Sequence, residues 1–282
     1  MRTVILLCLL ATSLWAQPKR IVSAAPSITE MLFALGLGDR VVGVTDFCRY
    51  PAEAESRPKI GSYLRPNLET ILAMRPDLVI IQKNPSQLAS KLRSMRLEVL
   101  ELDHDTIPKI HDSITKIGAA AGVPESAAKL NARIRSQLDE IRRKTAALPR
   151  RRLMFIVGRT PGTLDGLVAV GKASYLTEVM EAAGGVNVFA EAATAYPKIS
   201  LEEVLSRNPD VIVDMGDMAK TVAVSEEHKR SVVELWRRYQ VLKAVKQDRV
   251  FAVAADIFVV PGPRVIDAAL AFARMLHPEA GL

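Results

Sequence analysis

One pattern of apolar and polar positions occurs twice along the chain. It begins at Asn67 with NLETILAMRPDLVI and returns at Ser200 with SLEEVLSRNPDVIV. Each copy opens with a residue that can cap a helix, continues with apolar residues spaced three and four apart, and reaches a proline that cannot continue the helix. The β-branched run that follows is typical of a buried parallel strand. Each copy therefore predicts a capped helix followed by a strand, and the repetition predicts two similar lobes.

A second helix is also duplicated. The segments 28–36 and 175–184 align at a Thr-Glu pair, and both end at a glycine. Ser27 and Glu30, three residues apart at the start of the first segment, have the spacing of a capping box. The two halves of the chain therefore resemble each other over several elements.

Short strands and helices are predicted to alternate along the whole chain. Apolar runs of strand length occur near 20–25, 41–44, 78–81, 98–102, 152–157, 168–170, 211–213 and 249–254. Helical patterns lie between most of them, including 87–95, 109–121, 226–239 and 264–276. Strands that alternate with helices form parallel, doubly wound sheets. We therefore expect an α/β protein with two Rossmann-like lobes and mainly parallel sheets.

The longest predicted helix lies between the two copies of the pattern. The segment from Pro124 to Leu148 has no further glycine or proline and is rich in strong helix formers. At 1.5 Å per residue it spans roughly 36 Å, more than one lobe needs for its own core. An ordinary long surface helix is the alternative, but its position favours a rigid connection. The predicted organisation is an N-terminal lobe at 17–122, a linking helix at 123–148 and a C-terminal lobe at 149–282.

Residues 1–16 have the pattern of a secretory signal peptide. Arg2 precedes the apolar run from Val4 to Leu10, and small residues lead to Ala16. This run is too short to span a membrane and has the length of a signal-peptide core. We expect cleavage near Ala16 and release of a soluble monomer into the periplasm.

The charge of the chain argues against a nucleic-acid partner, and its cysteine content argues against an internal disulfide. The chain has 38 Lys and Arg against 31 Asp and Glu, and no basic run is interleaved with aromatic residues. This mild basic excess does not favour nucleic acid as the partner of an exported protein. Only Cys48 lies beyond the predicted signal peptide, so the mature chain cannot form an internal disulfide. Its stability must come from packing.

Aromatic residues gather in the predicted loops beyond the carboxyl ends of the strands. In open parallel sheets, ligands bind at that edge. Two facing lobes with aromatic loops indicate a cleft for a large, flat or partly apolar ligand. The alternative for each ring is that it covers the core of its own lobe. The candidate ligand-binding rings are Phe47, Tyr50, Tyr63, Tyr196 and Phe258.

Catalytic and metal sites have little support in the sequence. No nucleophile elbow, P-loop or dinucleotide-binding glycine motif follows a predicted strand, and the four histidines lack the spacing of a metal site. His104, in a loop on the side of the cleft, is either an axial ligand of a bound metal complex or a solvated loop residue. Cys48 has no activating partner in the sequence, so a packed or idle thiol is expected. We expect a protein that is not an enzyme and has no resident metal or cofactor.

Several of these motifs together resemble a known family. Besides the duplicated pattern, the segments that carry the resemblance are 26–30, 42–44, Tyr50-Pro51, Tyr196-Pro197, Asp256 and Pro263-Arg264. They resemble the exported solute-binding proteins of ABC importers in which one long helix joins two α/β lobes. This class carries cobalamin, ferric siderophores and haem, and the likeness is greatest to its cobalamin-binding members. The resemblance covers nearly the whole mature chain.

The resemblance implies a role for one glutamate in each copy of the pattern. In the family, one glutamate per lobe docks into arginine pockets of the membrane permease, and the matching positions are Glu69 and Glu202. By itself, each glutamate is better explained as offsetting the positive end of its helix, a contribution of about 0.3–1 kcal/mol. The family resemblance favours docking. Opposite charges at both ends of an interface fix its register and speed encounter.

The resemblance also implies the cargo and its site. The sequence departs from the family pattern in three ways: Gln82 replaces a cleft tryptophan, Tyr63 and Tyr196 replace two others, and an arginine is replaced near Val260. Gln82 is kept among the candidate ligand-binding residues. We expect a receptor that binds cobalamin or a related corrinoid and hands it to a permease. A ferric siderophore or haem receptor is the alternative within the class, and a two-lobed enzyme with the same cleft is the alternative outside it. The family's cobalamin-contacting positions correspond to Phe47, Tyr63, Tyr196 and Asp256.

Overall fold

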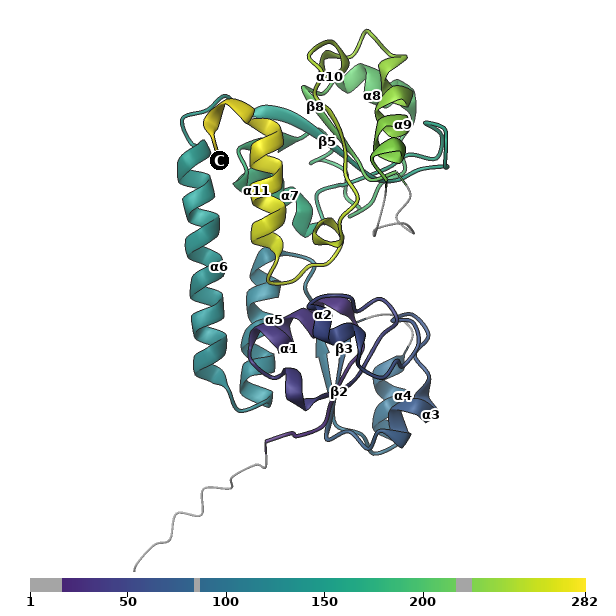
Figure 1. Cartoon of the computed structure of the whole chain (residues 1–282), viewed down its shortest axis with the longest axis vertical. Coiled ribbons are helices and arrows are strands. Elements are labelled where there is room, and N and C mark those ends of the chain that lie inside the picture. Colours follow the sequence, from purple (N-terminus) through teal and green to yellow (C-terminus); the bar gives the residue numbers. More distant parts are fainter. Residues whose placement is uncertain (1–16, 84–86, 217–224) are drawn as a thin grey trace, which may run out of the picture.

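The computed structural model describes residues 17–83, 87–216 and 225–282. The predicted signal peptide lies outside these residues. The described chain forms two α/β lobes, one above the other in Figure 1, with a long helix along one side of both. None of the helices in the described ranges has the length and apolar character needed to cross a membrane.

The N-terminal lobe contains a parallel four-stranded sheet in the order β2-β1-β3-β4. Its strands are β1 (Ile21–Ser23), β2 (Val41–Val44), β3 (Leu78–Gln82) and β4 (Val99–Leu102). Its helices are α1 (Pro26–Ala34), η1 (Gly38–Arg40), α2 (Ala52–Glu55), α3 (Leu68–Ala73), α4 (Leu88–Ser94) and α5 (Ile107–Ala120). The central strands β1 and β3 are short apolar runs buried on both faces, as is typical of parallel sheets, whereas the edge strand β4 is buried only at its two ends.

The C-terminal lobe contains a five-stranded sheet in which β5 pairs with β6, β7 and β8, and β8 pairs with β9. Only β6 runs antiparallel to its neighbour within this sheet. The strands are β5 (Arg151–Gly158), β6 (Val168–Ala169), β7 (Gly185–Asn187), β8 (Val211–Asp214) and β9 (Val250–Ala252). The helices are α7 (Tyr175–Ala182), α8 (Leu201–Arg207), α9 (Glu226–Arg237), α10 (Lys243–Lys246), η3 (Asp256–Phe258), α11 (Val265–Leu276) and η4 (Pro278–Ala280). The predicted fold class, two mainly parallel lobes, is confirmed.

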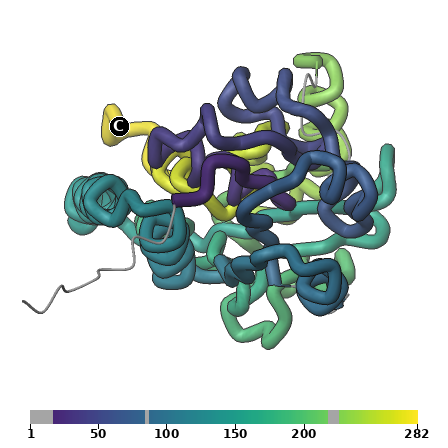
Figure 2. The backbone as a smooth tube through the Cα atoms, turned by 90° about the horizontal axis from the view of Figure 1, so that it is seen from below, coloured from purple at the N-terminus to yellow at the C-terminus, as the bar shows by residue number. Residues whose placement is uncertain are grey.

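The helix α6 (Pro124–Thr145) joins the two lobes. It packs against α5 of the N-terminal lobe and against α7 and α11 of the C-terminal lobe. Figure 2 shows it at the edge of the molecule. Its buried stripe recurs every three or four residues, as in Leu130, Ile134, Leu138 and Ile141. One apolar cluster includes this stripe and residues of both lobes, so α6 is a packed connection between them.

The repeated pattern has the same structural meaning in both lobes. Asn67 caps α3 by accepting the backbone N–H of Thr70 at 3.0 Å. Ser200 and Glu203 form a capping box at α8. After each proline, an aspartate accepts backbone N–H groups at the start of its lobe's first strand: Asp77 from Arg20 at 2.9 Å, and Asp210 from Arg152 at 2.9 Å. The pattern therefore ties each capped helix to a sheet.

The predicted capping box at Ser27 and Glu30 is wrong. The residue at the N-cap of α1 is Ala25, and no side chain caps this end. Pro26 occupies the first turn, where its missing N–H costs nothing. Glu30 instead contacts Arg264 from the other lobe. The spacing of Ser27 and Glu30 is compatible with a capping box, but in the folded chain the carboxylate of Glu30 makes a stronger, charge-assisted contact with Arg264.

Candidate functional site

A cleft of about 410 Å³ lies between the two lobes. Most of its lining residues follow the carboxyl ends of strands, where ligands of open parallel sheets bind. Its volume is in the range of small-molecule sites. The lining residues are Pro26, Ser27, Phe47, Arg49, Tyr63, Gln82, Asp105, Val157, Ala173, Ser174, Tyr175, Ala195, Tyr196, Asp256, Val259, Val260 and Pro261.

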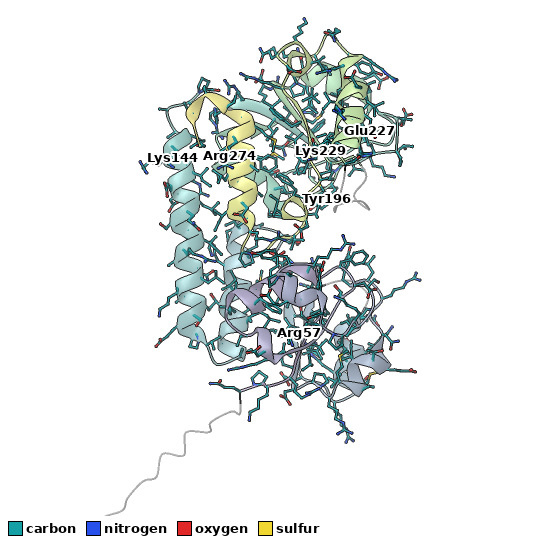
Figure 3. All side chains as sticks on the ribbon, in the orientation of Figure 1. Arg57, Lys144, Tyr196, Glu227, Lys229 and Arg274 are labelled. Atoms are coloured by element: carbon teal, nitrogen blue, oxygen red, sulfur yellow. The ribbon has the colours of Figure 1, made fainter. Side chains whose placement is uncertain are left out.

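Three of the predicted rings line this cleft. Phe47 and Tyr63 belong to the N-terminal lobe, and Tyr196 belongs to the C-terminal lobe. They are 53%, 42% and 48% exposed, so their faces are free for a ligand. Figure 3 shows Tyr196 at the edge of the C-terminal lobe nearest the other lobe. Ser174 donates to its hydroxyl over 3.5 Å, which holds the ring at the cleft wall.

Polar residues complete the walls. Gln82, the last residue of β3, and Asp256, the first residue of η3, both line the cleft. Asp105 lines it as well, and burial together with the neighbouring Asp103 raises the pKa of its carboxyl. Asp105 was not among the predicted site residues, although acidic residues directly after a predicted strand are a usable signal for a site at that edge of the sheet.

Two of the predicted rings lie elsewhere. Phe258 is only 2% exposed and packs with its centroid 5.6 Å from that of Phe155 and 5.2 Å from that of Phe272. It belongs to the core of its own lobe, so the alternative stated for such rings holds here. Tyr50 stacks on Arg264, whose Cζ lies 4.0 Å from the ring centroid, and lines a second, polar cavity of about 710 Å³.

Comparison with known proteins assigns the family. Residues 21–257 match the periplasmic binding protein family. The chain belongs to this family. A vitamin B12-binding protein from Vibrio cholerae is 31% identical over 262 residues, which cover 91% of this chain and 89% of that relative. An uncharacterized ABC transporter substrate-binding lipoprotein, YvrC, from Bacillus subtilis is 29% identical over 93% of this chain and 81% of the relative.

Solved structures share the fold of this periplasmic binding protein. The crystal structure of the periplasmic vitamin B12 binding protein BtuF of Vibrio cholerae matches with a TM-score of 0.77 at 29% identity, covering 94% of this chain and 98% of the other. The periplasmic heme-binding protein BhuT, in complex with two hemes, matches with a TM-score of 0.78 at 22% identity over 93% of this chain and 99% of the other. The second likeness shows the fold alone.

The floor of the cleft in this periplasmic binding protein is polar and buried. Ser27 Oγ lies 3.0 Å from Nε2 of His104, whose side chain is fully buried behind it. Burial lowers the pKa of His104 to about 4, so the imidazole is neutral near pH 7. This burial contradicts both interpretations of His104: the ring is not solvated, and it is inaccessible as an axial ligand. The hydroxyl of Tyr175 is also buried at the floor, without a partner among the described residues.

A charged cluster lies beside the cleft. Arg264, at the start of α11, donates from Nε to Oε2 of Glu30 at 3.0 Å and from Nη1 to Oδ1 of Asp256 at 2.9 Å. Its Nη2 also donates to Glu30. Burial raises the pKa of Glu30 to about 7, and the hydrogen bond from Arg264 lowers it only in part. Burial acts to lower the pKa of Arg264, but its hydrogen bonds and charge interactions with Glu30 and Asp256 together raise that pKa, so the guanidinium is charged.

Glu69 and Glu202 occupy equivalent places in the two lobes. Each is the second residue of its helix, α3 or α8, and each is exposed. Capping is done by Asn67 in one helix and by Ser200 with Glu203 in the other, so neither exposed glutamate is needed for it. In Figure 1 both helices lie on the side of the molecule opposite α6.

The thiol of Cys48 is packed in the apolar core. Cys48 is 1% exposed and lies 3.1 Å from the hydroxyl oxygens of both Thr29 and Thr45. Burial raises its pKa, so it is a neutral, packed thiol near pH 7. Across residues 17–83, 87–216 and 225–282, no group of three or more His, Cys, Asp or Glu side chains has the arrangement of a metal site.

Proposed function

We propose that this protein binds cobalamin or a related corrinoid in the interlobe cleft and delivers it to the permease of an ABC importer. The observation that carries the proposal is the cleft itself, whose opposite walls present Phe47, Tyr63 and Tyr196 with exposed faces. A corrinoid has a broad, flat ring system and amide side arms. Aromatic faces suit the ring system, and the carboxylate of Asp256 is an acceptor for amide N–H groups.

The relatives support a binding role for the cleft. The Vibrio cholerae relative, similar over 91% of this chain, is a vitamin B12-binding protein. The Ser27–His104 pair is the feature closest to a catalytic device, because a serine hydroxyl lies within hydrogen-bond distance of an imidazole. However, Nδ1 of His104 has no partner within the described residues, so no third group orients the ring. We infer binding and release without chemical conversion, and no resident cofactor.

Delivery is assigned to the two exposed glutamates. Glu69 and Glu202 place one carboxylate on each lobe, on helices that are capped by other residues. Two separated carboxylates match a permease that presents one basic pocket to each lobe and fix which way the cleft faces the pore. We place the mature protein in the periplasm as a monomer, after cleavage near Ala16.

Ligand binding by the purified chain from Gln17 onward tests the proposal. Cyanocobalamin, hydroxocobalamin, haem and a ferric hydroxamate siderophore are each titrated by calorimetry and followed by visible spectra. We expect both cobalamins to bind, with similar affinity and without new axial-ligand bands, because His104 is buried. Binding of haem or the siderophore with no binding of either cobalamin would replace the proposal by the alternative cargo. Turnover of any bound complex would contradict the non-enzymatic role.

A further inference from the structure

The two duplicated Thr-Glu pairs place a glutamate at the boundary between the lobes from each side. Glu30, on α1 of the N-terminal lobe, accepts hydrogen bonds from Arg264 of the C-terminal lobe. Glu178, on α7 of the C-terminal lobe, accepts the backbone N–H of Ile107 in the N-terminal lobe at 2.6 Å. Both glutamates therefore reach across to the other lobe, but only Glu30 meets a side chain.

Arg264 is enclosed on several sides at this boundary. Its side chain is 13% exposed, that of Glu30 is 3% exposed, and the ring of Tyr50 covers one face of the guanidinium. Gly262 packs so closely that a Cβ at this position would lie 3.2 Å from Glu30 Oε2. A planar guanidinium that donates in fixed directions imposes a defined geometry on its acceptors.

Asp256 belongs both to this charged cluster and to the cleft. Its Oδ1 accepts from Arg264 at 2.9 Å, and its side chain is 28% exposed. Within the described residues, no donor contacts Oδ2, which is the remaining acceptor. The backbone oxygen of Asp256 also accepts the N–H groups of Val259 and Val260, so η3 is hydrogen-bonded to the part of the cleft wall that follows it.

We infer that Arg264 is a positioning residue that joins the lobes through Glu30 and holds η3 so that the free oxygen of Asp256 faces the cargo. The part that concerns cargo rests on the proposed function. The joining of the lobes is a property of the protein without ligand. Arg264 itself does not line the cleft, so it acts on the cargo only through Asp256.

Hydrogen exchange of the ligand-free protein tests the connection between the lobes. The variants are Arg264→Gln and Glu30→Gln, with Arg57→Gln as the matched control. Arg57 lines the same polar cavity as Arg264 but pairs with Asp39 at 4.0 Å and lies over the Phe33 ring. At pH 8, where Glu30 is ionised, we expect Arg264→Gln to raise the exchange rate of amides in 256–260 at least tenfold.

The decisive variant is the one in the other lobe. Glu30→Gln lies in α1, yet we expect it to accelerate exchange in 256–260 of the C-terminal lobe as well. A salt bridge that merely stabilises α11 locally would not transmit this effect from α1. Unchanged exchange in 256–260 for Glu30→Gln, or equal effects of Arg57→Gln and Arg264→Gln, would overturn the inference. A circular dichroism spectrum and a melting curve confirm that each variant is folded.

A double-mutant cycle on cyanocobalamin affinity tests the orientation of Asp256. We expect Arg264→Gln and Asp256→Ala each to weaken binding about tenfold, and the double variant to bind no more weakly than Asp256→Ala alone. Arg264→Lys keeps the positive charge but loses the planar set of guanidinium donors, so its cyanocobalamin affinity should fall between those of the wild type and Arg264→Gln. Additive losses, or wild-type affinity in Arg264→Gln, would overturn this role. If the wild type binds no corrinoid, the proposed function fails, while the exchange comparison still decides whether Arg264 joins the lobes.

Discussion

The two lobes use the duplicated Thr-Glu pair in the same way internally and in different ways at their boundary. Within each lobe the threonine hydroxyl closes a buried polar network: Thr29 Oγ1 lies 2.7 Å from Ser23 Oγ, and Thr177 Oγ1 donates to the oxygen of Gly171 at 2.8 Å. Across the boundary, Glu30 binds a guanidinium, whereas Glu178 binds a backbone N–H. Equivalent residues therefore keep equivalent roles only where their surroundings are also duplicated.

The aromatic residues show the same contrast. The N-terminal lobe places Phe47 and Tyr63 at the cleft, and the C-terminal lobe places Tyr196 there. Phe258, in the loop that also carries Asp256, turns into the core of its lobe. The C-terminal lobe has a cluster of three aromatic rings at that point, and Phe258 buries its apolar surface in this cluster.

Alanine substitution of one aromatic residue in each lobe gives the largest expected difference in the free energy of unfolding. Phe258→Ala should lower the free energy of unfolding by about 3–5 kcal/mol, because it empties a packed core. Phe47→Ala should change it by less than about 0.5 kcal/mol, because that ring is 53% exposed, and should instead weaken corrinoid binding. Urea denaturation and calorimetry measure both quantities. Similar losses of stability in the two variants would contradict the assignment of one ring to the core and the other to the cleft.

Glu30, which contacts Arg264 at the boundary between the lobes, makes the stability of the protein depend on pH. Its pKa is about 7 in the folded protein, against an ordinary 4.5, because burial outweighs the contact with Arg264; the carboxylates of Asp256 and Asp267 raise it further. The folded protein therefore retains a proton that the unfolded chain has already released between these values. The stabilisation is complete below about pH 4.5 and is lost as the pH rises through 7.

Glu30→Gln removes this titration. We expect the wild type to lose on the order of 3 kcal/mol relative to Glu30→Gln between pH 4.5 and pH 8, since one unit of pKa corresponds to about 1.4 kcal/mol. Urea denaturation at each pH measures the difference. Parallel stability curves for the two proteins would show that burial does not shift this group.

The exposed glutamates test whether the lobes are equivalent at the permease. Glu69→Gln and Glu202→Gln should each slow uptake about tenfold in cells, and the double variant more, with unchanged corrinoid affinity, because each removes one charge from a two-point contact. The control is Glu203→Gln, the neighbour of Glu202, whose glutamine still completes the capping box at α8. Equal uptake by all three single variants would remove the docking role.

The stacked ring of Tyr50 has the smallest expected effect. Tyr50→Leu should cost about 0.5–1 kcal/mol of stability by removing the contact with the Arg264 guanidinium, and Tyr50→Phe, which keeps a ring, should cost less. Because Tyr50 lies outside the cleft, Tyr50→Phe should leave corrinoid affinity unchanged. A weakened affinity in Tyr50→Phe would instead place its hydroxyl on the cargo.

Local patterns predicted the elements that depend on neighbours in the sequence. The repeated pattern became α3 with β3 and α8 with β8, since caps and prolines act within a few residues. The short helices α2 and α10 were not predicted, because four residues do not show a helical period. Strand β7 was also missed, because it is three residues long and follows a glycine with positive φ.

The sequence alone determined two duplicated α/β halves, the long helix between them and the loops where a cleft would lie, because apolar periodicity and capping are local. Tertiary structure decided which side chains face the cleft. It buried His104 and Phe258, drew Tyr50 onto Arg264 and turned Glu30 from an expected cap into a contact between lobes. Such partners are far apart in sequence, and burial and charge choose among them only after the chain has folded.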